Sequence, residues 1–371
     1  MPDSPSLLIV GAGAAGLSAA FALRDHPIRV TVVEKSRGVS GRAATRWREV
    51  ETDAGTARWR YDHGAQYASP MPESRAATLL RDTLPSHDLH QIEGAVWPFD
   101  DDGTLRPDRV RPDAGMRWTY PDGIAEIGRR LRDAMPGLDL RMKTRVGKIQ
   151  KDGAQWEAVT DDGLAIGHGF DAVLLTAPAP QAADLLDSGP RDLVDALAAA
   201  SYRSQFSVMW GFQGVLERPG AFYALVNATE HGETTGGHDV AWLAFESDKP
   251  NRAPEGSTLL LAQMSPAWTQ AHYSEDRSDV VAAATRAVES LIGALPAPLW
   301  TDTQRWRYAL PDASLSPKAI ETAAAMNLFI AGDATAEKGR VHLALEEGLG
   351  VADRIVRQLE DGRRRTEDGG R

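Results

Sequence analysis

The feature that most constrains this sequence is a glycine-rich turn placed between a strand and a helix near its start. Residues 7–10 form a short apolar run of the kind that becomes a buried strand. Gly11, Gly13 and Gly16 follow with the spacing G-x-G-x-x-G, and a run rich in Ala and Leu then predicts a helix. A second apolar strand at residues 29–33 completes a strand–helix–strand unit. We therefore expect an α/β fold built on a parallel sheet.

Each glycine of this turn has its own physical role. Gly11 permits the tight turn, Gly13 lets the backbone approach a pyrophosphate, and Gly16 lets the helix and the strand pack closely. The N-terminus of the helix offers free N–H groups and the positive end of its dipole to the phosphates. Glu34 ends the second strand, where a carboxylate can accept hydrogen bonds from ribose hydroxyls. The unit is predicted to bind a dinucleotide.

Composition excludes several classes of protein. The 371 residues include no Cys, which rules out disulfides, Cys-ligated zinc, iron–sulfur clusters, a cysteine nucleophile and a cofactor tethered through Cys. The formal net charge of −11 argues against nucleic acid and anionic lipid as partners. No apolar run approaches the roughly 20 residues that span a bilayer, and residues 7–10 are too short for the core of a signal peptide. We expect a cytoplasmic protein with no membrane partner.

The chain is predicted to hold two domains, one inserted into the other. Residues 170–176 and 328–331 are apolar strands in the style of the first one, so the sheet begun at the N-terminus is completed far along the chain. Residues 203–212, 238–245 and 258–263 carry the aromatic and β-branched residues of a different, mixed or antiparallel sheet. The expected bounds are 1–75, 118–180 and 320–371 for the nucleotide-binding domain, and 76–117 and 181–319 for the substrate domain.

Three further segments favour FAD over NAD as the dinucleotide. Residues 40–42 (Ser-Gly-Arg) bring backbone N–H groups and an Arg fork towards a diphosphate. Residues 62–67 (Asp-His-Gly-Ala-Gln-Tyr) come next, and Gly332 and Asp333 follow the last apolar strand. This pattern resembles the glutathione-reductase-like flavoproteins, and among them the amine-oxidase branch. The resemblance implies that Gly332 and Asp333 bind the ribitol, and that the helix beginning near Leu343 points its N-terminus at the flavin.

The whole set of motifs resembles the renalase family more closely than the monoamine oxidases. The matching segments keep the same order over most of the chain: residues 40–45, 62–67, 120–124, 202–204, 304–308 and 332–333. This resemblance implies a p-hydroxybenzoate-hydroxylase-like fold with a Rossmann-type domain and non-covalent FAD. It also implies oxidation of the 2- and 6-dihydro isomers of NAD(P)H to β-NAD(P)⁺, with O₂ as the acceptor and hydrogen peroxide as its product. The chain would then be a metabolite-repair oxidoreductase.

The predicted cofactor-binding residues follow from the glycine turn and from this resemblance. They are Gly11, Gly13, Ala14, Ala15, Gly16, Glu34, Lys35, Gly41, Arg42, Ala65, Gln66, Tyr67, Val146, Gly332, Asp333, His342 and Leu343.

The substrate side carries weaker signals. Hydride transfer from a dihydropyridine to flavin N5 requires alignment of the reacting atoms and no protein base, which agrees with the absence of an obvious catalytic triad or carboxylate pair. Amine oxidases often hold a Lys near N5, and residues 259–264, where it would be sought, contain none. Arg203, Arg305 and Arg307 are candidates for binding a diphosphate of the substrate. The His residues are scattered, so no metal site is predicted. Candidate pocket residues are Gln66, Trp118, Tyr120, Trp242 and His342.

Other functions remain open at this stage. A flavin amine oxidase would show reduction of its flavin by simple amines. A non-catalytic FAD-binding protein would hold flavin that no small donor reduces. A carotenoid- or porphyrin-type desaturase shares the FAD motifs, but it expects membrane association, for which the sequence has no amphipathic basic segment.

Overall fold

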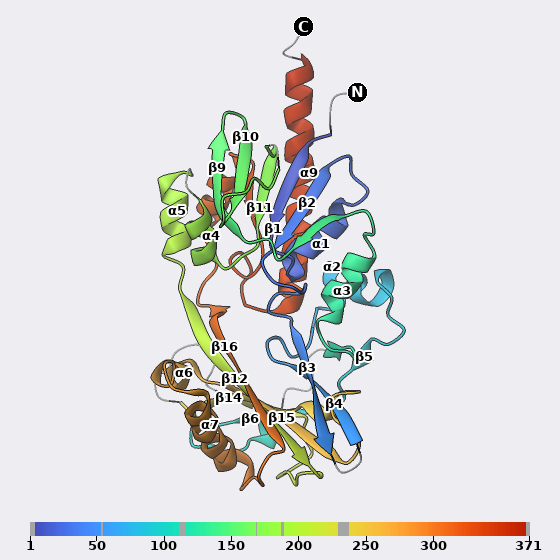
Figure 1. Ribbon diagram of the computed structural model, residues 1–371, viewed down its shortest axis with the longest axis vertical. Coiled ribbons are helices and arrows are strands. Elements are labelled where there is room, and N and C mark those ends of the chain that lie inside the picture. Colours follow the sequence, from blue (N-terminus) through green and yellow to red (C-terminus); the bar gives the residue numbers. More distant parts are fainter. Residues whose placement is uncertain are drawn as a thin grey trace.

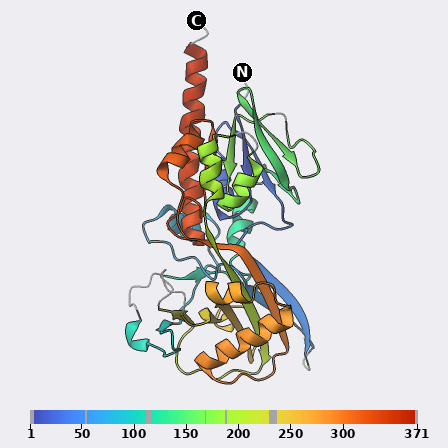
Figure 2. The same cartoon turned by 90° about the vertical axis from the view of Figure 1, so that its left-hand side faces the viewer.

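The computed structural model describes residues 4–52, 55–110, 116–167, 169–186, 189–228 and 237–368. Two sheets organise the molecule, one in the upper half and one in the lower half of Figure 1. Both chain ends lie at the upper half, and the last turns of the C-terminal helix extend beyond it (Figure 2).

The upper sheet is parallel and has five strands in the order β17-β11-β1-β2-β8. Strand β1 is buried along its whole length, as expected for a parallel strand covered on both faces. The first strands, the middle of the chain and its end therefore meet in one sheet, as predicted. The strands are β1 (Ser6–Val10), β2 (Arg29–Glu34), β8 (Asp139–Met142), β11 (Ala172–Leu175) and β17 (Leu328–Ile330).

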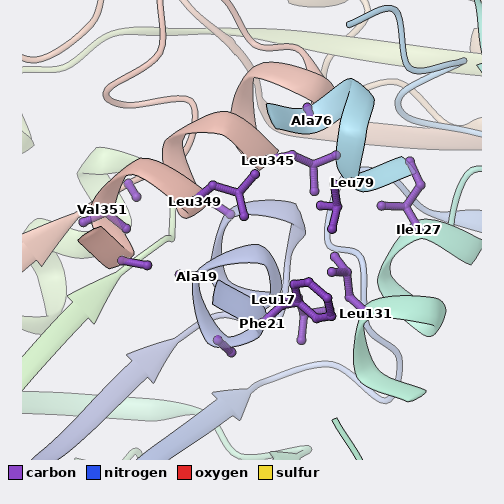
Figure 3. Packing of buried hydrophobic residues seen from close by; sticks show 14 of the residues in the cluster. Leu17, Ala19, Phe21, Ala76, Leu79, Ile127, Leu131, Leu345, Leu349 and Val351 are labelled. Atoms are coloured by element: carbon purple, nitrogen blue, oxygen red, sulfur yellow. The ribbon is translucent and has the colours of Figure 1, made fainter. Parts of the chain in front are cut away.

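One face of this sheet is covered by helices from distant parts of the sequence. Leu17 of the first helix, Leu345 and Leu349 of the last helix pack into one apolar cluster (Figure 3). Gly348 allows the two helices to cross closely, because a Cβ there would lie 2.2 Å from the carbonyl oxygen of Ala15. The elements of this face are α1 (Ala14–Leu23), α2 (Arg75–Thr78), η1 (Leu79–Thr83), α3 (Glu126–Asp133) and α9 (Val341–Asp368).

The opposite face of the parallel sheet is covered by three short helices and a hairpin. Leu8, Val10 and Leu175 point into this second cluster. The helices are α4 (Ala179–Leu185), α5 (Arg191–Ala198) and α8 (Pro317–Ala324), and the hairpin consists of β9 (Val146–Asp152) and β10 (Gln155–Thr160).

The lower sheet has six strands in the order β16-β12-β15-β14-β13-β6, antiparallel except for the last pair. Leu260 and Ala262 of β15 face the covering helices, whereas Leu259 and Leu261 face the other way, because side chains alternate along a strand. The strands are β6 (Val96–Phe99), β12 (Tyr202–Gln213), β13 (Ala224–Asn227), β14 (Val240–Phe245), β15 (Ser257–Met264) and β16 (Trp300–Pro311); the covering helices are α6 (Pro266–Ala271) and α7 (Arg277–Ile292).

A long hairpin links the two halves and corrects the expected domain bounds. Strands β3 (Thr45–Thr52) and β4 (Gly55–Asp62) run down from the nucleotide-binding domain along the lower sheet (Figure 2). Trp59 packs edge-on against Trp300 of β16, with ring centroids 5.5 Å apart. The hairpin thus packs on the substrate domain, although it falls within the predicted segment 1–75.

Two other boundaries also differ from the prediction. The segment from α2 through η1 packs against α1 and α9 in the nucleotide-binding domain, and α5 packs on the parallel sheet. Both had been assigned to the substrate domain because their strand and helix patterns do not reveal which core they join. The remaining short elements are β5 (His90–Gln91), η2 (Pro107–Arg109), β7 (Trp118–Thr119) and η3 (Glu246–Asp248).

Candidate active site

A cavity of about 1920 Å³ is lined by residues of both domains. It runs from the glycine turn after β1 to Trp242 and Gln263 on the lower sheet. Ordinary small-ligand pockets measure about 300–1,000 Å³. The cavity therefore has room for a dinucleotide and a second molecule.

The glycine turn forms one end of this cavity. Gly11 has φ +112°, in the region that favours glycine, and Gly13 has open space where its Cβ would be. A Cβ on Gly16 would lie 2.0 Å from the carbonyl oxygen of Gly11, and Gly16 does not line the cavity. Gly13 therefore leaves room for a ligand, while Gly16 serves the packing of the turn.

Glu34 binds the turn as well as facing the cavity. Its two carboxylate oxygens accept hydrogen bonds from the backbone N–H of Ala12 (2.9 Å) and of Ser36 (2.8 Å). The end of β2 is thereby held against the glycine turn. Each oxygen keeps further acceptor capacity for a ribose hydroxyl.

Asp333 supplies a second buried carboxylate at the end of β17. One oxygen binds the guanidinium of Arg42 at 2.5 Å, and Arg42 also donates to the carbonyl of Tyr308 at 3.0 Å. Burial opposes the charge of Arg42, but the bond to Asp333 prevails and raises its pKa. The hydroxyl of Tyr202 lies near Asp333, and burial together with this carboxylate raises the pKa of Tyr202 to about 12.

The other oxygen of Asp333 provides a test of whether a cofactor fits here. Oδ1 is buried and makes no hydrogen bond within the described parts of the chain. A buried acceptor without a donor is costly, so the site calls for a hydroxyl or N–H from a bound molecule. The unpaired oxygen and the open space at Gly13 suit a ligand that carries both a polyol and phosphates.

The structure brings nearly all the predicted cofactor residues to this cavity. All of them except Gly16 line it: Gly11, Gly13, Ala14, Ala15, Glu34, Lys35, Gly41, Arg42, Ala65, Gln66, Tyr67, Val146, Gly332, Asp333, His342 and Leu343.

Two of the predicted pocket residues, Trp242 and Gln66, lie together beside the lower sheet. Trp242 of β14 contacts Tyr67, with ring centroids 5.9 Å apart, and its indole N–H is buried without a partner in the described structure. Gln66 donates from Nε2 to the carbonyls of Asp62 and Gly64, which leaves its buried Oε1 without a donor.

The third predicted pocket residue that lines the cavity, His342, stands at the start of α9. Its Nδ1 accepts a hydrogen bond of 3.2 Å from the backbone N–H of Ser69. The ring therefore ties the N-terminal end of α9 to the loop that follows Tyr67.

Trp118 and Tyr120 do not reach the cavity, which corrects the prediction for both. Trp118 exchanges backbone hydrogen bonds with Ala68, and its side chain lies in the apolar cluster around α1. Tyr120 is fully buried beneath the guanidinium of Arg130, 4.2 Å from its ring centroid. Their segment is tied to the loop of residues 62–67 by Arg252, which binds Asp62, the hydroxyl of Thr119 and the carbonyl of Tyr120.

Of the arginines proposed for a substrate diphosphate, only Arg307 lines the cavity. Arg203 pairs with Asp312 at 3.3 Å, and Arg305 donates to the carbonyl of Tyr273.

A cluster of buried charges supports the loop of residues 62–67 and had no recognisable signal in the sequence. Asp62 binds Arg252 at 2.7 Å and Lys249 at 3.2 Å, and Lys249 also binds Glu246 at 2.6 Å. Lys249 donates to the carbonyl of Gln66 at 2.7 Å. All four charged side chains are fully buried. They join the loop beside the cavity to the turn after β14.

Two further residues of the lower sheet complete the wall. Gln263 of β15 donates to the carbonyl of Gly64 at 2.8 Å. Trp306 of β16 donates to the carbonyl of His63 at 2.8 Å, and its ring stacks on the His63 ring. Side chains alternate between the two faces of a strand, so Gln263 and Trp306 could have been predicted only if the face towards the cavity had been known.

Comparison with known proteins assigns this architecture. The sequence pattern described as flavin containing amine oxidoreductase matches residues 101–356, and that of an NAD(P)-binding Rossmann-like domain matches residues 9–83. The chain belongs to the flavin-containing amine oxidoreductase family. Within this flavoprotein family it is renalase-like: it is 23% identical to the renalase of Mus musculus over 327 residues, 84% of this chain and 87% of that protein.

Solved structures of the same fold are similar along almost the whole chain. A protein assigned as a protoporphyrinogen oxidase from Exiguobacterium has a TM-score of 0.75, with 17% identity over 96% of this chain and 99% of its own. Putrescine oxidase bound to putrescine has a TM-score of 0.69, with 14% identity over 95% and 100%. A fatty acid isomerase from P. acnes has a TM-score of 0.67, with 14% identity over 95% and 99%.

The cofactor of this family member is FAD. The residues described above fit it. Glu34 and the free oxygen of Asp333 would accept hydrogen bonds from its hydroxyls, and the N-terminus of α1, which lines the cavity, would face its phosphates. Within the described residues no group of three or more His, Asp or Glu is placed to hold a metal ion. No helix in the described ranges is long and apolar enough to cross a membrane.

Two histidines beside the cavity predict how stability depends on pH. Burial lowers the pKa of both His63 and His342 to about 4. Histidines of the unfolded chain titrate near 6.5, so between about pH 6.5 and 4 the unfolded state binds more protons and the folded state loses stability as the pH falls. We expect the free energy of unfolding, measured with urea at fixed FAD, to fall less steeply with falling pH in His342→Gln than in the unmodified protein. The two slopes should differ by up to about 1.4 kcal/mol per pH unit. Equal slopes in the two proteins would contradict this assignment.

Proposed function

We propose that this enzyme oxidises the 2- and 6-dihydro isomers of NAD(P)H to β-NAD(P)⁺. The carbon–hydrogen bond at C2 or C6 of the dihydropyridine breaks, and its hydride leaves the substrate with both electrons. O₂ then accepts the two electrons with two protons and becomes hydrogen peroxide. The proposal follows the activity that the resemblance to renalases implies, and the wall of the cavity supports it.

The observation that carries the proposal is a pair of unpartnered polar atoms on an aromatic wall. Among the residues that the structure describes, Oε1 of Gln66 has no donor and the indole N–H of Trp242 has no acceptor. Both residues line the cavity, next to the ring of Tyr67. A carboxamide offers one donor and one acceptor group, and a dihydropyridine ring is flat. A dihydronicotinamide therefore matches both the polar atoms and the aromatic surface.

The chain contributes binding and orientation to this reaction. FAD, when bound, supplies the acceptor of the hydride. The aromatic rings of Tyr67 and Trp242 limit where a flat ring can lie, and Gln66 fixes its rotation through the carboxamide. The backbone N–H groups at the start of α9 face the same cavity and favour negative charge there. No side chain needs to take a proton from the substrate.

The surroundings of this wall favour dihydronicotinamides over amines. Gln263, not a lysine, occupies the face of β15 towards the cavity. Lys249 lies behind the wall, enclosed by Asp62, Glu246 and the carbonyl of Gln66. The cations Arg117 and Arg340 also line the cavity, both act on Tyr67, and they would repel an ammonium group there.

An anaerobic absorbance titration of the purified holoenzyme tests the proposal. One equivalent of 2- or 6-dihydro-NAD per flavin should bleach the flavin bands within mixing, while β-NADH and putrescine leave them unchanged at the same concentration. After air is admitted, β-NAD⁺ and hydrogen peroxide should appear in equal amounts. Gln66→Met keeps the size of the side chain and removes its acceptor together with its hydrogen bonds to the carbonyls of Asp62 and Gly64. It should slow bleaching by about 10- to 100-fold, because the contact with the carboxamide is lost and the loop that positions it is loosened.

Different results would point elsewhere. Bleaching by amines alone would make the protein an amine oxidase. Flavin that no donor reduces would identify a non-catalytic FAD-binding protein. Equal rates in Gln66→Met and the unmodified enzyme would remove the carboxamide contact from the proposal.

A further inference from the structure

We propose that Arg117 and Arg340 form an anion subsite that binds a phosphate group of the substrate. The inference rests on the proposed function, because these two residues would bind the substrate proposed there. It concerns a part of the cavity separate from the glycine turn, which the cofactor's own diphosphate uses.

The fold brings these two arginines from distant segments into the wall of one cavity. Arg117 immediately precedes β7, and Arg340 immediately precedes α9. Both line the cavity, and the positive charges of both act on the hydroxyl of Tyr67. Burial raises the pKa of Tyr67, and the two arginines oppose that rise. Both arginines therefore line the cavity in the neighbourhood of Tyr67.

Neither arginine is neutralised by a carboxylate of the described chain. Arg117 donates to the carbonyl of Gly94 at 2.8 Å, and its Nε is buried with no hydrogen-bond partner. Arg340 is exposed, and within the described ranges it donates only to the carbonyl of Gly339, at 3.3 Å. By contrast, Arg109 in the same lining pairs with Asp100 at 3.1 Å. Unpaired guanidinium donors facing a cavity are suited to a phosphate, which takes two of them at once.

The neighbouring helix adds to the positive field. Val341, His342 and Leu343 at the N-terminal end of α9 line the cavity next to Arg340. Burial lowers the pKa of His342, and the positive charge of Arg340 lowers it further, so the field of Arg340 reaches this end of α9. The protein carries a net charge of −11, so a local group of cations is needed to hold an anionic substrate.

The test compares Arg340→Gln with Arg357→Gln, an exposed position of α9 that does not line the cavity. The donors are 6-dihydro-NAD, 6-dihydronicotinamide mononucleotide and uncharged 1-methyl-1,6-dihydronicotinamide. Arg340→Gln should raise KM about tenfold for the two phosphorylated donors through loss of one charge-assisted contact. For the uncharged donor, KM should change less than about twofold, and kcat should stay the same for all three. Arg357→Gln should behave like the unmodified enzyme.

A second variant and a binding measurement complete the test. Arg117→Gln, checked for flavin content and folding, should show the same selectivity for phosphorylated donors. The Kd of β-NAD⁺ for the oxidised holoenzyme, measured by calorimetry, should rise about tenfold in Arg340→Gln and lose part of its dependence on salt. An equal rise of KM for charged and uncharged donors, or an unchanged Kd, would overturn the subsite.

The binding measurement separates failure of this inference from failure of the proposed function. If no dihydronicotinamide bleaches the flavin, the proposed reaction is wrong. Calorimetry with β-NAD⁺ and with inorganic pyrophosphate then decides the subsite alone. If Arg340→Gln binds these two ligands more weakly than the unmodified holoenzyme, the anion subsite is supported. If the unmodified holoenzyme binds neither of them, the subsite is wrong.

Discussion

Replacing Lys249 by Met is expected to lower the free energy of unfolding by about 3–5 kcal/mol, the usual cost of breaking a buried ion pair from one side. Lys249 is fully buried between Asp62 and Glu246 and also binds the carbonyl of Gln66. Met has nearly the same length and lacks the charge. Arg252 still neutralises Asp62 in the variant, so Glu246 is the carboxylate that is left buried without its cation.

The pH dependence of this loss distinguishes charge from packing. Burial already raises the pKa of Glu246, and removal of Lys249 should raise it further. A raised pKa in the folded state adds stability at low pH, and this contribution is lost as the pH rises through the folded value. Unfolding in urea at saturating FAD should therefore show a larger deficit for Lys249→Met at pH 8 than at pH 5.5.

Two further variants serve as controls. Lys318→Met on the exposed side of α8 should change stability by less than about 0.5 kcal/mol. The double variant Glu246→Gln/Lys249→Met should recover part of the loss, because no uncompensated carboxylate remains. A deficit that is independent of pH and not relieved by Glu246→Gln would show that only the volume of the side chain matters.

Gly13→Ala and Gly16→Ala should both weaken FAD binding, but for different physical reasons. At Gly13 a Cβ meets no protein atom within 4 Å, and the backbone is extended (φ −79°, ψ −174°), so alanine fits the apoprotein. Its methyl group then occupies the space next to the phosphates. FAD affinity should fall about tenfold or more, as expected for overpacking of 1–3 kcal/mol, while the stability of the apoprotein stays within about 0.5 kcal/mol.

At Gly16 the conflict lies within the protein itself. A Cβ would lie 2.0 Å from the carbonyl oxygen of Gly11 and 3.3 Å from Cγ2 of Ile9. The turn must therefore shift even without a ligand, and the apoprotein should lose about 1–3 kcal/mol of stability together with its flavin. Urea unfolding of the apoprotein and fluorescence titration with FAD measure the two effects. If Gly13→Ala destabilised the apoprotein as much as Gly16→Ala, the separation of roles between the two glycines would be wrong.

Local patterns were enough to predict the cofactor end of this protein. The glycine spacing and the carboxylate of Glu34 act within one strand–helix–strand unit, where the hydrogen bonds and the close contacts join near neighbours in sequence. The roles of Gly332 and Asp333 came from the resemblance to the flavoproteins, and the structure places both residues in the wall of the cavity. The fold class could be predicted from the local patterns, and FAD as the cofactor from these patterns together with that resemblance.

The substrate end was predicted only in part. Tyr67, Gln66 and Trp242 reach the cavity as expected, while Trp118 and Tyr120 face the core behind the loop. Whether an aromatic ring lies on the inner or the outer side of a short strand depends on which domain packs against it. The residues adjacent in sequence do not indicate which domain this will be.

The sequence by itself thus determined the nucleotide-binding unit, since its chemistry depends on spacing along one stretch of chain. Only the tertiary structure decided the rest of the site. Lys249 became a buried partner of Asp62, and Arg117 and Arg340 came to line one cavity, because distant segments of the chain pack together. Contacts between residues more than 180 positions apart arise from the packing of whole sheets and helices, and single-sequence patterns carry no record of them.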